Sequence, residues 1–230
     1  PNVLMNTALL DASYRGGVKK YLFVSSSTVY PVVEYPVKED EVNSSFFSKY
    51  KVEGWVKHFS EVICEMYADS RRQNLKTIIL RPANLYGPYD NFDPEHSHVI
   101  PALIRKVVER QEPIEVWGDG KDLKGFVFID DFVEAMVIAI NRMEQAEPIN
   151  IGEIRPYTIQ ELLEIILQAD DCQGSSIIFN RSRPTMIKKR LLDSTKCRMQ
   201  LNFTPKTSLR EGISRTIQWY RNQPESLKTN

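Results

Sequence analysis

Hydroxyl side chains gather directly after an apolar run near the start of the chain. The run Tyr21-Leu22-Phe23-Val24 predicts a short buried strand, and Ser-Ser-Ser-Thr-Val-Tyr-Pro follows it. Open α/β sheets bind their ligands at the ends of their strands. A hydroxyl group there can donate and accept hydrogen bonds with polar ligand atoms. The pattern therefore predicts a ligand site directly after this strand.

The next helical segment adds an acidic and a basic side chain. Glu53 and Lys57 are one helical turn apart in residues 50–68, whose apolar residues recur at helical spacing. We expect Lys57 to lower the pKa of Glu53 or to hold its carboxylate as an ion pair. The loop of residues 31–48 separates the helix from the hydroxyl cluster, and a loop of this length inside a compact domain is usually functional.

The elements that must position these groups alternate between strands and helices over the first 150 residues. Such alternation favours an α/β fold with a parallel, doubly wound sheet. Asp130, Thr158 and Ser208 are expected to cap helices. The periodicity predicts helices over 2–13, 50–68, 98–108, 130–142, 158–169 and 208–222, and strands over 21–24, 76–80, 114–117, 126–129, 149–152 and 175–179.

Composition and charge restrict the classes of function. The chain of 230 residues is 42% hydrophobic and 26% charged, which is ordinary for a globular protein, and no apolar run could span a membrane. Thirty basic and thirty acidic residues cancel, so neither a nucleic-acid nor a membrane partner is expected. The three cysteines are scattered, which indicates free thiols in a reducing, cytoplasmic compartment. No metal site is expected.

Several separated motifs together resemble the extended short-chain dehydrogenase/reductase family, in its nucleotide-sugar epimerase, dehydratase and reductase branch. They are S-S-S-T-V-Y-P, W-V-K-H-F-S-E, R-P-A-N-L-Y-G-P, F-I-D-D, N-I-G and the terminal F-T-P-K-T-S-L-R-E-G followed by W-Y. The stretch from Asn84 to Lys106 most resembles the epimerase-reductases that act on GDP-4-keto-6-deoxymannose. The resemblance implies a Rossmann-type fold with a small α/β substrate lobe, a nucleotide-sugar substrate, and NADP or NAD as cofactor. No G-x-G-x-x-G occurs, so the first strands and the glycine-rich loop are expected to be absent from this chain.

The resemblance also implies roles for individual residues. Ser26 would orient the sugar, Lys57 would bind the nicotinamide ribose, and His98 would serve as an acid in epimerisation. The other positions implied are Thr28 and Glu53 for catalysis, Ser25, Pro82 and Leu85 for the cofactor, and Asn84, Lys106, Trp117 and Lys124, together with His98, for the substrate.

Three positions depart from the family pattern. Thr28 stands in place of a catalytic cysteine, Lys124 in place of an arginine, and Glu53 in place of the tyrosine of Y-x-x-x-K. A second register, with Ser45 and Lys49, also lacks the tyrosine. Because an ionised glutamate cannot give a proton to a developing alkoxide, two hypotheses remain open. The chain is either an NAD(P)-dependent enzyme on a nucleotide-diphosphate sugar, or a catalytically impaired relative that binds a sugar nucleotide or a partner subunit.

Domain and subunit organisation follow from the same pattern. Residues 1–150 are expected to form the dinucleotide-binding domain, with 84–124 contributing to the substrate lobe, and residues 151–230 to form a C-terminal substrate-binding lobe. Helices 2–13 and 50–68 carry broad apolar stripes and resemble the family's dimer helices. They predict a homodimer built as a four-helix bundle, although burial against the sheet alone would also explain the stripes.

Overall fold

A parallel three-stranded sheet forms the centre of the larger layer of the molecule. The computed structural model describes residues 2–43, 45–69, 75–144, 146–152, 155–183 and 185–224. The strands β1 (Lys20–Val24), β2 (Lys76–Pro82) and β7 (Pro148–Ile151) pair in the order β1-β2-β7. Parallel strands need crossover connections, and helices provide them here. The prediction of an α/β fold with a parallel sheet is confirmed.

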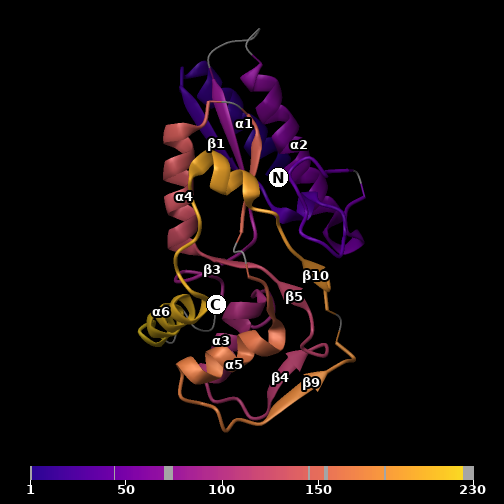
Figure 1. Cartoon of the computed structure of the whole chain (residues 1–230), viewed down its shortest axis with the longest axis vertical. Coiled ribbons are helices and arrows are strands. Elements are labelled where there is room, and N and C mark those ends of the chain that lie inside the picture. Colours follow the sequence, from indigo (N-terminus) through magenta and orange to yellow (C-terminus); the bar gives the residue numbers. More distant parts are fainter. Residues whose placement is uncertain are drawn as a thin grey trace.

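Helices cover both faces of this sheet (Figure 1). Helices α1 (Asn2–Arg15) and α2 (Lys51–Ala68) pack on one face, where Leu10 and Cys64 share a core with Ile79 of β2. Helix α4 (Ile129–Arg142) packs on the other face, against Ile78 and Leu80. Successive side chains of a strand point to opposite faces, so the continuous apolar run of β2 supplies both cores.

A second layer is built from three helices around a separate core. Helices α3 (Val99–Val108), α5 (Ile159–Ala169) and α6 (Leu209–Arg221) meet below the sheet in Figure 1, with β4 (Ile114–Trp117) and β9 (Ile177–Asn180) at their edge. This core draws on residues 86–128 as well as 157–220. The proposed boundary at residue 150 and the contribution of 84–124 to the substrate lobe both stay predictions.

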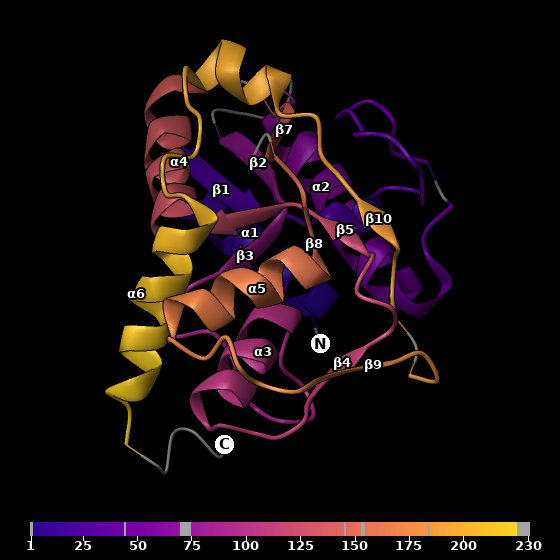
Figure 2. The same ribbon diagram turned by 60° about the horizontal axis from the view of Figure 1, so that its bottom comes forward.

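Short strands join the two layers (Figure 2). Strand β3 (Asn84–Tyr86) pairs with β6 (Phe126–Phe128) in parallel. Strand β5 (Leu123–Lys124) lies between β10 (Lys189–Arg190) and β8 (Tyr157–Thr158). Residues far apart in the chain therefore approach one another directly beyond the ends of β1 and β2.

The predicted helix caps were right in two cases and wrong in one. Thr158 Oγ1 accepts from Glu161 N at 3.1 Å in a complete capping box, and Ser208 Oγ accepts from Glu211 N at 3.2 Å. Asp130 is not a cap, because α4 begins at Ile129 with Phe128 at the capping position. The neighbouring Asp131 turns its carboxylate to the backbone N–H of Thr207 at 2.9 Å, which ties α4 to the segment before α6.

Three features of the described residues bear on membrane insertion, on the cysteines and on metal binding. Within the described ranges, no helix is long and apolar enough to cross a membrane. Cys64, Cys172 and Cys197 are free thiols, as their scattered positions indicated. No group of three or more possible metal ligands occurs among the residues that the structure describes.

Candidate active site

The turn after β1 contains hydroxyl groups in two different situations. Ser26 Oγ accepts from Thr28 N at 3.1 Å and so caps the short 3-10 helix η1 (Ser27–Val29). Ser25 is 3% exposed, and neither its Oγ nor Thr28 Oγ1 has a hydrogen-bond partner among the described residues. Buried hydroxyls without partners are rare in folded proteins and call for an explanation. Two of them within the first four residues after β1 fit a ligand site.

Helix α2 begins directly against this turn. A Cβ atom on Gly54 would lie 2.8 Å from Thr28 O and 2.9 Å from the Phe46 ring, so only glycine allows the approach. One turn further, Lys57 Nζ donates to Val24 O at 2.8 Å, at the last residue of β1. Burial lowers the pKa of Lys57, and Glu61 opposes that shift. Lys57 therefore lies at the end of β1, and its role in cofactor binding stays a prediction.

Glu53 lies apart from Lys57. It is exposed in the first turn of α2, and no ion pair joins it to Lys57 in the described part of the chain. Its charge acts instead on Tyr50, whose pKa it helps to raise. The expected Glu53–Lys57 pair is therefore not seen, because the Lys57 ammonium turns inward to the Val24 carbonyl. The catalytic role of Glu53 stays a prediction.

A further register of the Y-x-x-x-K spacing was missed from the sequence. Phe47 and Lys51 have the same four-residue step, and Lys51 is the first residue of α2. Phe47 packs its ring against Tyr50 at 5.8 Å between centroids. The signal that could have indicated this register is Gly54, because a glycine inside a helix often marks a close approach. In this register too, the position of the tyrosine is occupied by another residue.

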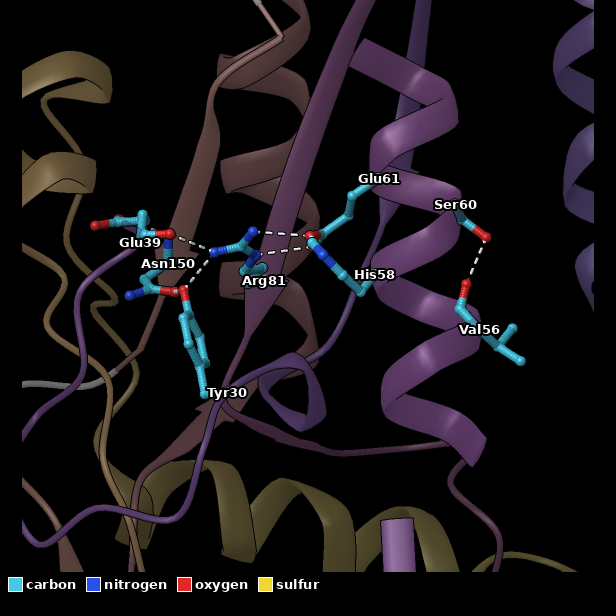
Figure 3. A network of polar contacts seen from close by, with 8 residues as sticks. All are labelled: Tyr30, Glu39, Val56, His58, Ser60, Glu61, Arg81 and Asn150. Atoms are coloured by element: carbon cyan, nitrogen blue, oxygen red, sulfur yellow. Dashed lines mark hydrogen bonds and ion pairs between the residues drawn. The ribbon is translucent and has the colours of Figure 1, made fainter. Parts of the chain in front are cut away.

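A buried polar network fixes Tyr30, the residue that ends the turn after β1 (Figure 3). Arg81 of β2 donates from Nε and Nη2 to the two Glu61 oxygens, each at 2.8 Å. Its Nη1 donates to Tyr30 Oη at 2.8 Å, and Tyr30 Oη donates to Asn150 Oδ1 at 2.6 Å. Glu39 closes the network by accepting from Asn150 N at 2.9 Å. The network therefore anchors the site turn and the loop after it to the sheet.

A second buried arginine reaches the same turn from β10. Arg190 is 8% exposed, and its Nη1 donates to Pro31 O at 3.1 Å and Tyr30 O at 3.4 Å. Its Nη2 is buried with no hydrogen-bond partner in the ranges described. Desolvation lowers the pKa of Arg190 to about 10, with Tyr50 and Tyr30 acting in the opposite direction. Sequence reasoning missed this residue, because nothing local separates it from Lys188 and Lys189.

The two predicted substrate lysines are already engaged with the protein. Lys124 Nζ donates to Ile187 O and lies 3.5 Å from Asp122 Oδ2. Lys106 Nζ donates to Glu115 O at 2.6 Å. Burial lowers the pKa of both ammonium groups. Each lysine can offer a ligand only the donors that these contacts leave free.

The remaining predicted residues lie on two sides of the junction between the layers. Pro82 is buried at the end of β2, Leu85 is half-buried in β3, and the exposed Asn84 donates from Nδ2 to Gly125 O at 2.8 Å. His98 is exposed at the start of α3. Trp117 is 51% exposed, with the Arg183 guanidinium 5.3 Å above its ring. Contacts join Ser25, Ser26, Thr28 and Lys57 to one strand end, whereas Lys106 and Trp117 meet around Glu115 in the second layer.

Comparison with known families identifies the architecture. A model described as the NAD dependent epimerase/dehydratase family matches residues 1–152. GDP-L-fucose synthase 1 of Arabidopsis thaliana is 35% identical over 231 residues, which cover 95% of this chain and 68% of that protein. The GDP-L-fucose synthase of Escherichia coli (strain K12) is 29% identical over 234 residues, covering 95% of this chain and 72% of the relative.

Solved structures agree with the sequence comparison. A GDP-L-fucose synthetase from Naegleria fowleri bound to NADP superimposes with a TM-score of 0.88 at 25% identity, covering 99% of this chain and 71% of that one. A UDP-glucose 4-epimerase from Thermotoga maritima with UDP-glucose gives a TM-score of 0.83 at 29% identity, covering 96% of this chain and 69% of that one. Of the two hypotheses left open by the sequence, these relatives support the enzyme.

Proposed function

Because the chain belongs to the NAD-dependent epimerase/dehydratase family, we propose that it is an NAD(P)-dependent epimerase-reductase of GDP-linked 4-keto-6-deoxy sugars. The observation that carries the proposal is the strand-end group of Ser25, Thr28 and Lys57, with two buried hydroxyls that have no partner among the described residues. The GDP-linked sugar is favoured over other nucleotide sugars because the similar proteins are GDP-L-fucose synthases.

The donor set at this strand end fits the nicotinamide half of NAD(P). Ser25 Oγ and Thr28 Oγ1 can hydrogen-bond polar ligand atoms, and Lys57 brings a positive charge to the last residue of β1. When bound, the cofactor supplies or accepts a hydride. The protein's part is to orient the sugar through Ser26, to exclude water with Pro82 and Leu85, and to move protons.

The substrate side of the proposal involves groups from both layers. Arg190, whose Nη2 has no partner among the described residues, is the cation that we assign to the diphosphate, since a guanidinium can bind two phosphate oxygens at once. Lys124 and Lys106 would add charge without bidentate geometry. Asn84, Trp117 and His98 stay candidates for the sugar, the base and the epimerisation acid, in that order.

Nicotinamide absorbance with GDP-, UDP- and dTDP-linked 4-keto sugars tests the proposal. We expect the GDP sugar to react fastest, and Lys57→Met to slow hydride transfer by about 100-fold, at the lower end of the range for removing a catalytic group. Lys76→Met is the matched control, because Lys76 pairs with Glu144 on the surface. Equal rates for Lys57→Met and the control, or no reaction with any of the three sugars, would contradict the proposal.

A homodimer through α1 and α2 is proposed for the assembly. The two helices pack together through Asn6 Nδ2 and Ser60 Oγ at 3.0 Å, yet large apolar side chains face outward from both. The most exposed of these are Leu4 (77%), Met5 (60%) and Leu9 (56%) on α1, and Val52 (72%), Phe59 (45%), Val62 (46%) and Met66 (46%) on α2. An apolar surface of this kind usually marks an interface, and four such helices can form a bundle.

Light scattering with paired variants tests the dimer. Phe59→Glu with Val62→Glu should convert the dimer to monomer, because two buried charges would be left unpaired at the interface. Val133→Glu on α4 is the control, since Val133 is 49% exposed on the opposite face of the sheet. A wild-type protein that is monomeric at micromolar concentration would exclude the proposed interface.

The free thiols are consistent with a reducing cytoplasmic compartment, which we also propose.

A further inference from the structure

Asn150 is the first residue of the N-I-G motif, and no step of the proposed chemistry uses it. It lies in β7, where it pairs in register with Arg81 of β2, and its side chain is 0% exposed. A buried amide is costly unless its donors and its acceptor are hydrogen-bonded. The partners of the Asn150 side chain therefore show what it holds together.

The Asn150 amide joins two segments that are far apart in the chain. Its Oδ1 accepts from Tyr30 Oη at 2.6 Å, at the end of the turn after β1 (Figure 3). Its Nδ2 donates to Val37 O at 3.0 Å and to Asp193 O at 3.1 Å. Asp193 belongs to residues 191–194, which directly follow β10 and which we call the strap. A single side chain therefore bridges the turn after β1 and the strap.

The strap extends this bridge to Arg190. Val37 N donates to Leu191 O at 3.1 Å, and Asp193 N donates to Val37 O at 2.9 Å, so the strap pairs with the loop after the turn. Arg190 directly precedes the strap, and its Nη1 donates back to Pro31 O at 3.1 Å. The spacing between the Arg190 guanidinium and the turn therefore depends on how the strap is seated.

We propose that Asn150 is a positioning residue, an inference that rests on the proposed function: its amide sets the spacing between the turn after β1 and the Arg190 guanidinium. In that function the turn faces the nicotinamide half of the cofactor, and Arg190 binds the diphosphate of the sugar nucleotide. A cation that is already held in place needs no ordering when the diphosphate binds. The ordering of one flexible side chain would otherwise weaken binding by about three- to tenfold.

The same motif attaches the strap a second time without forming this bridge. Ser194 Oγ donates to Gly152 O at 3.2 Å, and Gly152 is the last residue of the motif. That hydrogen bond ties the strap to the chain after β7, but it does not involve Tyr30 or the turn. Comparing the two attachments therefore separates a positioning role from simple anchoring of the strap.

Calorimetry with GDP tests the positioning role through a double-mutant cycle. Asn150→Ala should weaken GDP binding by about three- to tenfold, whereas the matched control Ser194→Ala should stay within about twofold of the wild type. Because the amide acts through Arg190, Asn150→Ala combined with Arg190→Met should bind GDP within about twofold of Arg190→Met alone. Losses that add in the double variant, or equal losses in Asn150→Ala and Ser194→Ala, would overturn the inference.

Tyr30→Phe breaks the same bridge from the turn and is the second variant if Asn150→Ala does not fold. It removes one hydroxyl and leaves the Asn150 donors on Val37 O and Asp193 O. GDP binding should again weaken by about threefold, and this loss should disappear when Arg190→Met is already present. Binding of GDP by Tyr30→Phe as tight as that of the wild type would contradict the positioning role.

Amide hydrogen exchange tests the bridge without any ligand. In Asn150→Ala the Asp193 N–H should exchange about fivefold faster, as expected for the loss of one hydrogen bond. The Ile114 N–H, which donates to Ser176 O at 2.8 Å in the second layer, should keep its wild-type rate. No change at Asp193, or an equal rise at both amides, would overturn the inference. If the exchange changes as expected but the wild type binds no GDP, the proposed function fails and the bridge between the turn and the strap stands.

Discussion

Two buried arginines, Arg81 and Arg190, stand on either side of Tyr30 and differ in how completely they are paired. Arg81 is 3% exposed, with a bidentate pair to Glu61 and further bonds to Tyr30 Oη and Glu39 O (Figure 3). Arg190 is 8% exposed, has only carbonyl partners for Nη1, and keeps Nη2 unpartnered among the described residues. Both bury a full positive charge, but among the described residues a carboxylate pairs with Arg81 and none pairs with Arg190.

This difference in pairing distinguishes the charge of Arg81, which is satisfied within the protein, from the charge of Arg190, which a ligand could still pair. Burying a charge costs several kcal/mol unless it is paired and hydrogen-bonded. Arg81 meets that condition within the protein, so its role is complete without a ligand. Arg190 meets it only in part, so a negatively charged group would still gain from binding there. Arg81 therefore stabilises the turn after β1, whereas the binding role of Arg190 stays a proposal.

Removing Arg81 should produce the largest effect on stability. Arg81→Met leaves the Glu61 carboxylate buried without its partner, and breaking such a pair costs about 3–5 kcal/mol. Chemical denaturation should show a loss of this size in the free energy of unfolding. Lys206→Met is the control, because the Lys206–Glu134 pair is on the surface and should contribute at most about 1 kcal/mol. A loss for Arg81→Met as small as the control would remove the distinction between the two arginines.

Removing Arg190 should change binding more than stability. Arg190→Met loses the bonds to two carbonyls but also relieves an incompletely paired charge, so the free energy of unfolding should fall by no more than about 1 kcal/mol. The affinity for GDP sugars should fall by about 1.5–3 kcal/mol, the range for a hydrogen bond to a charged group. Calorimetry measures the affinity. A variant that is strongly destabilised yet binds normally would reverse the roles assigned to the arginines.

Local patterns predicted the fold better than they predicted the site. The periodicity of α2 and the apolar run of β2 were sufficient to place both elements, because each buries a face against a neighbouring layer. The capping box at Thr158 and the side-chain cap at Ser208 were predictable because the partners of each cap lie within one turn. The cap at Asp130 failed because the next residue, Asp131, is recruited by a segment 76 residues away.

The site depends on contacts that no local pattern contains. Lys124 looked like a free cation, but its ammonium group donates to a carbonyl 63 residues later in the chain. Arg190 looked like one basic residue of three, but the short β10 strand turns it inward against Tyr30, 160 residues earlier. Glu53 and Lys57 had the right spacing for an ion pair, yet the Lys57 ammonium donates to the Val24 carbonyl instead. In each case a tertiary hydrogen bond decided where a flexible charged side chain would point.

The smallest expected effect is on how fast the free energy of unfolding falls at alkaline pH. It distinguishes the buried Tyr30 from an exposed tyrosine. Desolvation raises the pKa of Tyr30 above the ordinary value of 10, although Arg81 acts to lower it. Above pH 10 the folded protein therefore keeps the Tyr30 proton, whereas the unfolded chain releases it. The contribution of Tyr30 to the free energy of unfolding is therefore complete below pH 10 and is lost as the pH rises beyond 10. Each proton released only on unfolding adds a slope of about 1.4 kcal/mol per pH unit at most.

Tyr30→Phe should thus be less stable at neutral pH but should lose stability more slowly between about pH 10 and pH 11. Denaturant titrations at several pH values measure the slope, with Tyr89→Phe as control, because the Tyr89 side chain is 86% exposed. Parallel slopes in Tyr30→Phe and the wild type would show that the phenol is not held by the Arg81 network in solution.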